Sequence, residues 1–202
     1  MKSLSIVVAI TGASGAIYGA RFVRALAALT TGQSRLIVSP TALRVYNEEY
    51  GTKIETPAQY LEAALGDSKG SQSFVLDDFR DVGGKPASGS TPSDGMVIVP
   101  CSMKTLAAIA HGYTTNLIER GADVCLKERR RLVVVPRESP YSLIHLRNMT
   151  SLTEAGGIVL PASPGFYQRP QNLEDLGDFI AGRILGLFGV PHQLFKGWLT
   201  DS

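Results

Sequence analysis

Hydrophobic and polar positions along this chain fall into two repeating patterns. Short, continuously apolar runs predict strands at residues 5–10, 35–40, 73–77, 95–102, 131–138 and 157–164. Between them, apolar residues recur every three or four positions and predict helices at 15–29, 41–49, 57–65, 103–110, 114–127, 140–154 and 172–188. The segment 81–95 is instead rich in Gly, Ser and Pro, which is typical of a loop.

The predicted strands are almost uninterrupted in their hydrophobicity, which indicates burial on both faces. Strands of this kind, separated by helices, predict an α/β fold with a mostly parallel sheet and helices on each side. Since no internal repeat or linker divides the chain, we expect a single doubly wound, Rossmann-like, three-layer domain over residues 1–202. Ligands of such a sheet bind at the carboxyl ends of its strands.

The composition changes this picture little: 44% of the residues are hydrophobic, 19% are charged, and the formal net charge is +2. So small a charge does not indicate a nucleic-acid-binding protein, whereas a pI of about 8.6 is compatible with an anionic small ligand. Cys101 and Cys125 match neither a disulfide framework nor a zinc motif. No run reaches ~18 apolar residues, and the N-terminus shows no cleavage pattern. We therefore expect a cytoplasmic protein without a metal.

The residues that follow the predicted strands are rich in hydroxyls, glycines, prolines and charges. Because the carboxyl ends of parallel strands meet at one edge of a sheet, these residues are expected to converge. They are TGASG at 11–15, Ser39, PCSMKT at 100–105, PRESP at 136–140 and PASPGFYQRP at 161–170.

The stretch TGASGAIYG (11–19) joins a strand to a helix through a Gly-rich turn, as phosphate-binding loops do. Its glycine spacing does not match the dinucleotide fingerprint, the second strand ends in Ser39 and Pro40 rather than an acidic residue, and no G-K-[ST] follows. What remains is a helix N-terminus with free backbone N–H groups and the Ser14 hydroxyl, suited to one phosphate. FMN is the natural candidate. The alternative is that the glycines only make a tight turn.

Four blocks of the chain resemble the UbiX-type flavin prenyltransferases: TGASGAIYG, VPCSMKTLAAIAHG (99–112), NLIERGADVCLKERRRLVVVPRESP (116–140) and LPASPGFYQRPQ (160–171). The resemblance implies a metal-independent transfer of a dimethylallyl group from its monophosphate to N5 and C6 of reduced FMN. It also implies that the prenylated FMN serves a UbiD-type decarboxylase in ubiquinone or aromatic-acid metabolism. Members of the family form trimers that assemble into a dodecamer, with active sites between subunits.

The resemblance assigns roles to particular residues. It implies FMN contacts from Gly12, Ala13, Ser14, Ser39, Ser102, Met103, Lys104, Thr105 and Arg137, with Met103 and Lys104 acting through their backbone. It implies a dimethylallyl phosphate site that includes Arg120, Lys127, Tyr167 and Arg183. We expect Ser88, Gly89, Ser90 and Trp198 to line the same site. The residues expected to be catalytic are Glu49, Glu138, Lys127 and Ser14.

Several of these assignments have simpler alternatives. We assign Glu138 to proton transfer on the phosphate side and Glu49 to proton transfer at the flavin ring, since nearby phosphate raises a carboxyl pKa. Glu48 competes with Glu49, and Glu138 could instead form an ion pair with Arg137 or Arg183. Simple packing is the alternative for Trp198, and a rim position beside apolar neighbours is the alternative for Arg183.

Two other classes of protein compete with the prenyltransferase interpretation. An FMN-dependent decarboxylase of cysteinyl substrates shares the fold and cofactor, but it requires a His near the second strand and an Asn in a P-x-S-A-N-T loop. This chain reads PCSMKT there, and its first histidine is His111. A non-catalytic flavin-binding protein has no use for a cluster of Lys, Arg and Tyr beside the ring.

Overall fold

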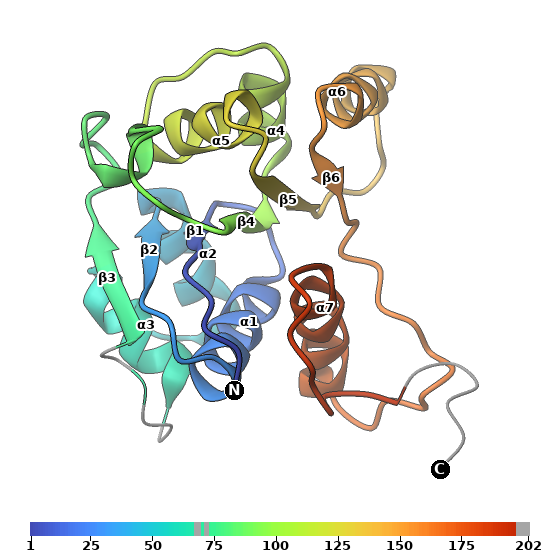
Figure 1. Ribbon diagram of the computed structural model, residues 1–202. Helices are drawn as coiled ribbons and strands as arrows, with labels where there is room; N and C mark the ends of the chain where they lie inside the picture. The colour runs from blue at the N-terminus through green and yellow to red at the C-terminus, as the bar shows by residue number, and fades with distance from the viewer. Residues whose placement is uncertain (67–69, 71–72, 197–202) are drawn as a thin grey trace.

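The computed structural model describes residues 1–66, 70 and 73–196, so the predicted site residue Trp198 lies outside the described part of the chain. Six parallel strands form one sheet with the order β3-β2-β1-β4-β5-β6 (Figure 1). The strands are β1 (Val7–Ile10), β2 (Ser34–Val38), β3 (Phe74–Asp77), β4 (Gly95–Cys101), β5 (Arg131–Pro136) and β6 (Ile158–Val159). The α/β, Rossmann-like fold class predicted from the sequence is confirmed, and every pairing in the sheet is parallel.

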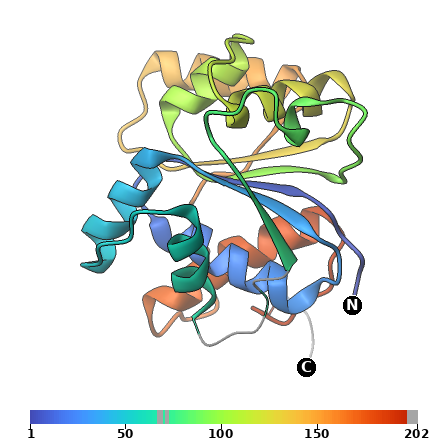
Figure 2. The same ribbon diagram turned by 90° about the vertical axis from the view of Figure 1, so that its left-hand side faces the viewer.

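Helices cover both faces of the sheet, as Figure 2 shows from the side. They are α1 (Ala16–Leu29), α2 (Pro40–Tyr50), α3 (Pro57–Leu65), α4 (Met103–Ala110), α5 (Leu117–Lys127), α6 (Leu143–Glu154) and α7 (Leu173–Leu187), with a 3₁₀ turn η2 at Lys85–Ala87. Within the described ranges, no helix is long and apolar enough to cross a bilayer.

The core lies on the two faces of the sheet because successive strand residues point to opposite sides. In β1, Val8 and Ile10 pack with α1 and α7 on one face, while Val7 and Ala9 pack with α4 and α5 on the other. The central strands β1 and β4 are buried along their whole length. Double-sided burial explains why the strand sequences are continuously apolar rather than alternating.

Three elements begin or end at least three residues away from the sequence expectation. Helix α5 starts at Leu117 rather than 114 because Asn116 caps it, accepting a hydrogen bond from the Glu119 backbone N–H at 3.1 Å. Helix α6 starts at Leu143 rather than 140 because Ser142 and His145 form a capping box. Strand β6 has two residues, although the Leu160 and Ala162 amides continue to donate to carbonyls of the β5 chain.

Candidate active site

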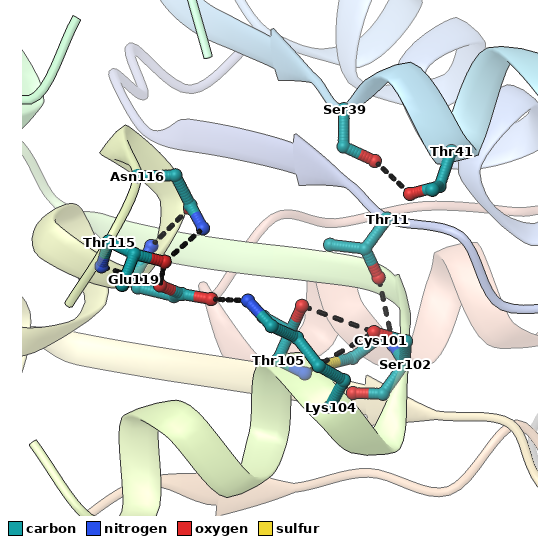
Figure 3. Close-up of polar contacts among 10 residues, drawn as sticks. All are labelled: Thr11, Ser39, Thr41, Cys101, Ser102, Lys104, Thr105, Thr115, Asn116 and Glu119. Carbon is teal, nitrogen blue, oxygen red and sulfur yellow. Dashed lines mark hydrogen bonds and ion pairs between the residues drawn. The ribbon is translucent and has the colours of Figure 1, made fainter. Parts of the chain in front are cut away.

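The order of the strands reverses between β1 and β4, and in open α/β sheets ligands bind in the crevice at such a switch point. Thr11 ties the two loops that leave these strands. Its hydroxyl donates to the Pro100 carbonyl at 2.9 Å and accepts from the Ser102 amide at 2.8 Å. Figure 3 shows this contact beside the residues described next. The switch point is therefore held by one buried threonine.

A cavity of about 430 Å³ opens at this point, within the size range of small-molecule sites. Most of its polar groups are hydroxyls or amides that follow the carboxyl ends of strands. The lining residues are Thr11, Gly12, Ser39, Pro40, Thr41, Phe79, Ser102, Lys104, Thr105 and Asn116. The structure thus brings five of the nine predicted cofactor residues to one cavity: Gly12, Ser39, Ser102, Lys104 and Thr105.

Two of the helices that begin at this cavity, α2 and α4, are each capped by a serine. Ser39 Oγ accepts from the Ala42 amide at 3.1 Å and lies 3.0 Å from Thr41 Oγ1. Ser102 Oγ accepts from the Thr105 amide at 3.3 Å and donates to Thr105 Oγ1 at 3.1 Å. Because helix N-termini carry partial positive charge, the cavity favours a negatively charged group.

The glycine at the start of the β1–α1 loop is required by close packing. A Cβ atom at Gly12 would lie 2.6 Å from Thr41 Cβ, so the backbone at one of these two residues would have to move. The Thr41 side chain of α2 occupies the space beside Gly12, so a residue with a side chain does not fit at position 12. Hydroxyl, amide and ammonium donors around a cavity of this size fit a flavin mononucleotide, which presents a phosphate and a polar ring edge.

The loop between β1 and α1 differs from the expectation. The sequence predicted free N–H groups at this helix start, but the Gly15 and Ala16 amides each donate to the Glu49 carboxylate at 2.7 Å. The prediction of free amides is wrong here, because a residue from α2 closes the N-terminus of α1. Glu49 rather than Glu48 reaches the loop, although Glu49 remains exposed to solvent.

Three further residues surround this turn. Arg137 Nε donates to the Ser14 carbonyl at 2.9 Å, so the exit of β5 is tied to the exit of β1. The ring of Tyr18 lies against Gly15. Burial raises the pKa of the Tyr18 phenol, Arg137 opposes the change, and Glu49 adds to it. Ala13 is buried within the same loop.

Glu138 follows Arg137 and is half-buried; its carboxylate accepts from the Ser139 amide at 2.9 Å. Its predicted role in proton transfer stays a prediction. Met103 is the first residue of α4 and its side chain is buried, which suits the expectation that only its backbone faces a ligand. Burial raises the pKa of the Cys101 thiol, so this residue behaves as a small core side chain and not as a nucleophile.

Four predicted substrate residues lie at the other edge of the sheet. Helix α5 runs from the carboxyl edge to the amino edge, so Lys127, at its end, stands four positions before β5. Lys127 pairs with Glu128 at 2.5 Å, and a Cβ atom at Gly89 would lie 2.9 Å from its ammonium. Gly89 lies between Ser88 and Ser90, whose hydroxyls are 2.8 Å apart. Within one chain these residues are not brought together with Ser14 and Ser39.

The remaining predicted substrate residues are two arginines on helices and one tyrosine in a loop. Arg120 is in the first turns of α5 and pairs with Asp123 at 2.8 Å. Arg183 is exposed in the second half of α7. Tyr167 belongs to the loop before α7, where its ring packs edge-on against the Phe179 ring, with the two ring centroids 6.1 Å apart. Their roles toward a phosphate stay predictions.

A neighbouring cavity of about 480 Å³ lies at the ends of β2 and β3. It shares Pro40 and Phe79 with the first, but its lining carries three carboxylates, from Glu55, Asp77 and Asp78, against one cation, Arg80. Carboxylates repel an anionic ligand, and one of them, Asp77, is already paired with Arg35. The cavity at the switch point is therefore the candidate site for an anionic ligand. Within the described residues, no group of three or more His, Cys, Asp or Glu side chains is placed to hold a metal ion.

Sequence reasoning missed several residues of this region. Thr41 and Asn116 line the cavity, Thr11 ties its two loops, and Tyr18 packs on the β1–α1 turn. Two signals were readable in the sequence: Thr11 is the first polar residue after β1, and Asn116 precedes a helix. The buried carboxylate of Glu119 accepts a hydrogen bond from Lys104 of α4, a contact that spacing along the chain does not reveal.

Known proteins resemble this chain over its whole length. Residues 1–185 match the family described as Flavoprotein. The flavin prenyltransferase UbiX of Methanothermobacter thermautotrophicus is 45% identical over 195 residues, which cover 96% of this chain and 94% of that protein.

Two solved structures are also similar. The crystal structure of AnUbiX (PadA1) in complex with FMN and dimethylallyl pyrophosphate has a TM-score of 0.86 and 41% identity, covering 100% of both chains. A dodecameric FMN-dependent Ubix-like decarboxylase from Escherichia coli O157:H7 has a TM-score of 0.84 and 36% identity, covering 96% of this chain and 99% of that one. The chain therefore belongs to the flavoprotein family and, within it, to the UbiX-type flavin prenyltransferases.

Proposed function

We propose that this chain is a flavin prenyltransferase that joins a dimethylallyl group to reduced FMN. The observation that carries the proposal is the cavity at the β1/β4 switch point, lined by the serine-capped starts of α2 and α4, in a chain 45% identical to a UbiX enzyme. When bound, reduced FMN supplies the two nucleophilic ring positions, N5 and C6. N5 would replace the phosphate at C1 of the dimethylallyl group and lose its proton. C6 would bond to the far carbon of the allylic double bond, which would take up a proton at its other carbon while C6 loses one.

The residues of this chain bind and orient the flavin. Ser39, Thr41 and Thr105 offer hydroxyls, Asn116 offers an amide, and Arg137 offers a guanidinium beside the Ser14 loop. Hydroxyls and guanidinium groups suit both a phosphate and a polar ring edge. Glu49 and Glu138, at the exits of the same sheet edge, are our candidates for moving protons.

We propose that the prenyl phosphate site is completed by a second copy of the chain. Lys127 and Ser88–Ser90 lie at the amino edge of the sheet, so one chain cannot direct them at its own Ser14 loop. A similar protein is a dodecamer, which supports repeated contacts between copies. In such an assembly, Lys127 stabilises the negative charge of the departing phosphate, together with Arg120, Tyr167 and Arg183.

The decisive experiment is anaerobic incubation of the purified chain with reduced FMN and dimethylallyl monophosphate. We expect the flavin mass to rise by one C5 unit with release of phosphate, measured by mass spectrometry and phosphate assay. Parallel incubation with the diphosphate distinguishes the two donors. Unmodified FMN with both donors would contradict the proposed function.

Exchange of subunits tests the shared site. Ser14→Ala and Lys127→Ala are each expected to retain FMN and lose turnover. After co-refolding of equal amounts, random assembly restores a wild-type Ser14 and a wild-type Lys127 to roughly a quarter of the sites if they come from different chains. No recovered activity in the mixed assembly would contradict a site built from two chains.

The acidic pair at 48–49 offers a matched control for the proton-transfer roles. Glu49→Gln and Glu138→Gln are expected to bind FMN normally with turnover lowered by roughly a hundredfold or more, as for loss of a general acid or base. Glu48→Gln, which changes an adjacent exposed carboxylate, is expected to retain full turnover. Normal turnover in Glu49→Gln would show that this carboxylate serves only to accept the hydrogen bonds of the Gly15 and Ala16 amides.

We further propose that the prenylated FMN is delivered to a UbiD-type decarboxylase in the cytoplasm. The described cysteines, Cys101 and Cys125, are both unpaired, which suits a reducing compartment. The alternative reaction, decarboxylation of cysteinyl substrates, lacks support from the site because Lys104 stands where that class requires an Asn. Reconstitution of a purified UbiD-type apoenzyme with the product tests the delivery.

A further inference from the structure

We propose that Glu119 is a positioning residue that holds the ammonium of Lys104 at the cavity, where Lys104 serves as the cation facing the negative charge of the flavin nucleotide. The inference rests on the proposed function, since it takes FMN as the ligand of this cavity. It assigns a role to the Lys104 side chain, whereas the family resemblance implied only a backbone contact.

Glu119 is a fully buried carboxylate with an unusual number of donors. Its Oε2 accepts from the Thr115 amide and from the Thr115 hydroxyl, both at 2.8 Å, and its Oε1 accepts from Lys104 Nζ (Figure 3). A buried charge is costly unless it is hydrogen-bonded in this way. Burial alone would raise the pKa of Glu119, but the bonds from Lys104 and Thr115 lower it below the ordinary value. The carboxylate is therefore ionised at neutral pH.

The Lys104 side chain is fixed at its ammonium group by Glu119, while the rest of the side chain is largely exposed. Its side chain is 68% exposed, yet its ammonium is bound to a carboxylate that is 0% exposed. A free lysine loses rotamer entropy when it binds a ligand, whereas this one is already ordered by a contact between α4 and α5. The arrangement is that of a pre-positioned cation.

Among the described residues that line the cavity, Lys104 is the one with a formal charge. The Glu119 carboxylate is also solvated by two hydrogen bonds from Thr115 and by its place in the first turn of α5, so it does not need every donor of the ammonium. Glu119 Oε1 takes one of the three donors of the Lys104 ammonium, and the others are available to a ligand in the cavity that Lys104 lines. Its target is either the phosphate or the ring, which becomes anionic on reduction.

The test is flavin binding, measured by the quenching of flavin fluorescence without turnover. Lys104→Met is expected to weaken FMN binding roughly tenfold, the usual scale for losing a charged hydrogen bond. Lys104→Arg is expected to recover most of the affinity. Lys85→Met removes the same charge from an exposed lysine on η2 and is expected to leave affinity unchanged.

A double-mutant cycle isolates the role of Glu119. Glu119→Gln is expected to weaken FMN binding in the wild-type background and to have no further effect in the Lys104→Met background. An effect of Glu119→Gln that persists without Lys104 would overturn the positioning role. Should Glu119→Gln fail to fold, the three lysine variants still test the cation.

Two ligands distinguish the source of the negative charge. If Lys104 faces the phosphate, Lys104→Met weakens the binding of FMN but not that of riboflavin. If it faces the ring, the variant lowers the reduction potential of bound flavin. Unchanged affinity and potential in Lys104→Met, with normal binding to the wild type, would overturn this inference alone. A wild-type chain that binds no FMN would overturn the proposed function as well.

Discussion

Thr11 shows how one side chain can hold a binding site in shape. Its hydroxyl donates to the Pro100 carbonyl and accepts from the Ser102 amide, so it joins the exits of β1 and β4 at the point where the strand order reverses. Valine has nearly the same shape as threonine but neither donates nor accepts a hydrogen bond. The change Thr11→Val therefore separates the bonds from the packing.

Thr11→Val is expected to lower the free energy of unfolding by about 1–2 kcal/mol, because the buried Ser102 amide loses its acceptor. It is also expected to weaken FMN binding, since the two loops are released from each other. Urea unfolding and fluorescence quenching measure the two effects. Thr30→Val is the control: it removes a buried hydroxyl bonded to the Leu26 carbonyl at 2.7 Å, at the far end of α1. Equal FMN affinities in the two variants would contradict the role of Thr11.

Glu119 gives the protein a specific response to acid. Its pKa lies below the ordinary value of 4.5 in the folded protein, so its stabilising contribution is complete above about that pH and is lost as the pH falls through the folded pKa. We expect Glu119→Gln to be about 1–3 kcal/mol less stable than wild type at pH 7. The difference is expected to shrink below pH 4.5. Urea unfolding at several pH values measures it, with the exposed Glu62→Gln as control; a difference that grows in acid would contradict the assignment.

At the scale of elements, the site is made by the starts of helices. Helices α2, α4 and α5 begin at the cavity with Ser39, Ser102 and Asn116 as caps. Helix α1 also begins at this edge, but its first amides are bonded to Glu49 from α2. The packing of α2 against α1 thus directs an anion toward α2 and α4 and away from α1.

Gly15 is the residue that lets the chain turn from β1 into α1. Its φ of +98° lies in the left-handed region, and a Cβ atom there would lie 2.7 Å from the Tyr18 ring. Gly15→Ala is expected to destabilise the protein by about 1–2 kcal/mol from strain alone, with the clash adding to it. Gly51→Ala has a similar φ of +63° and open space around it, so it measures the strain without the clash. Equal losses in urea unfolding would show that the Tyr18 contact is unimportant.

Much of the fold could be predicted from the sequence because a strand buried on both faces requires apolar residues at successive positions. Continuous apolar runs gave the strands, and the polar residues behind them gave the sheet edge that carries Ser39, Ser102 and Arg137. The closure of α1 by Glu49 could not be predicted, because it joins residues 34 positions apart in a direction set by helix packing. The position of Lys127 at the amino edge of the sheet follows because α5 runs antiparallel to the strands, a long-range arrangement that local sequence patterns do not report.

At the scale of the whole molecule, one region of the surface is unusually apolar. Near the start of α6, Leu143 is 60% exposed, Ile144 67% and Leu146 47%, and Tyr141 precedes them. Side chains of this kind gathered in one place mark contact surfaces. Since the proposed site needs a second copy of the chain, we expect this region, residues 141–146, to be covered in an assembly.

Ile144→Glu is expected to shift the protein toward smaller species, because it places a charge in an apolar contact. Light scattering coupled to size exclusion measures the mass, and circular dichroism checks that the chain remains folded. Val82→Glu introduces the same charge at an exposed apolar residue of the loop between β3 and β4 and is expected to leave the mass unchanged. An unaltered mass in Ile144→Glu would place the contact elsewhere.

The burial of both cysteines has a practical consequence. Cys101 is 0% exposed and Cys125 3%, and burial raises the pKa of the Cys125 thiol to about 11. Alkylating reagents attack the thiolate, so the native protein should react very slowly at neutral pH. Modification then requires local opening of the fold at β4 for Cys101 or at α5 for Cys125, so the labelling rate of the wild-type chain reports how readily these two elements open.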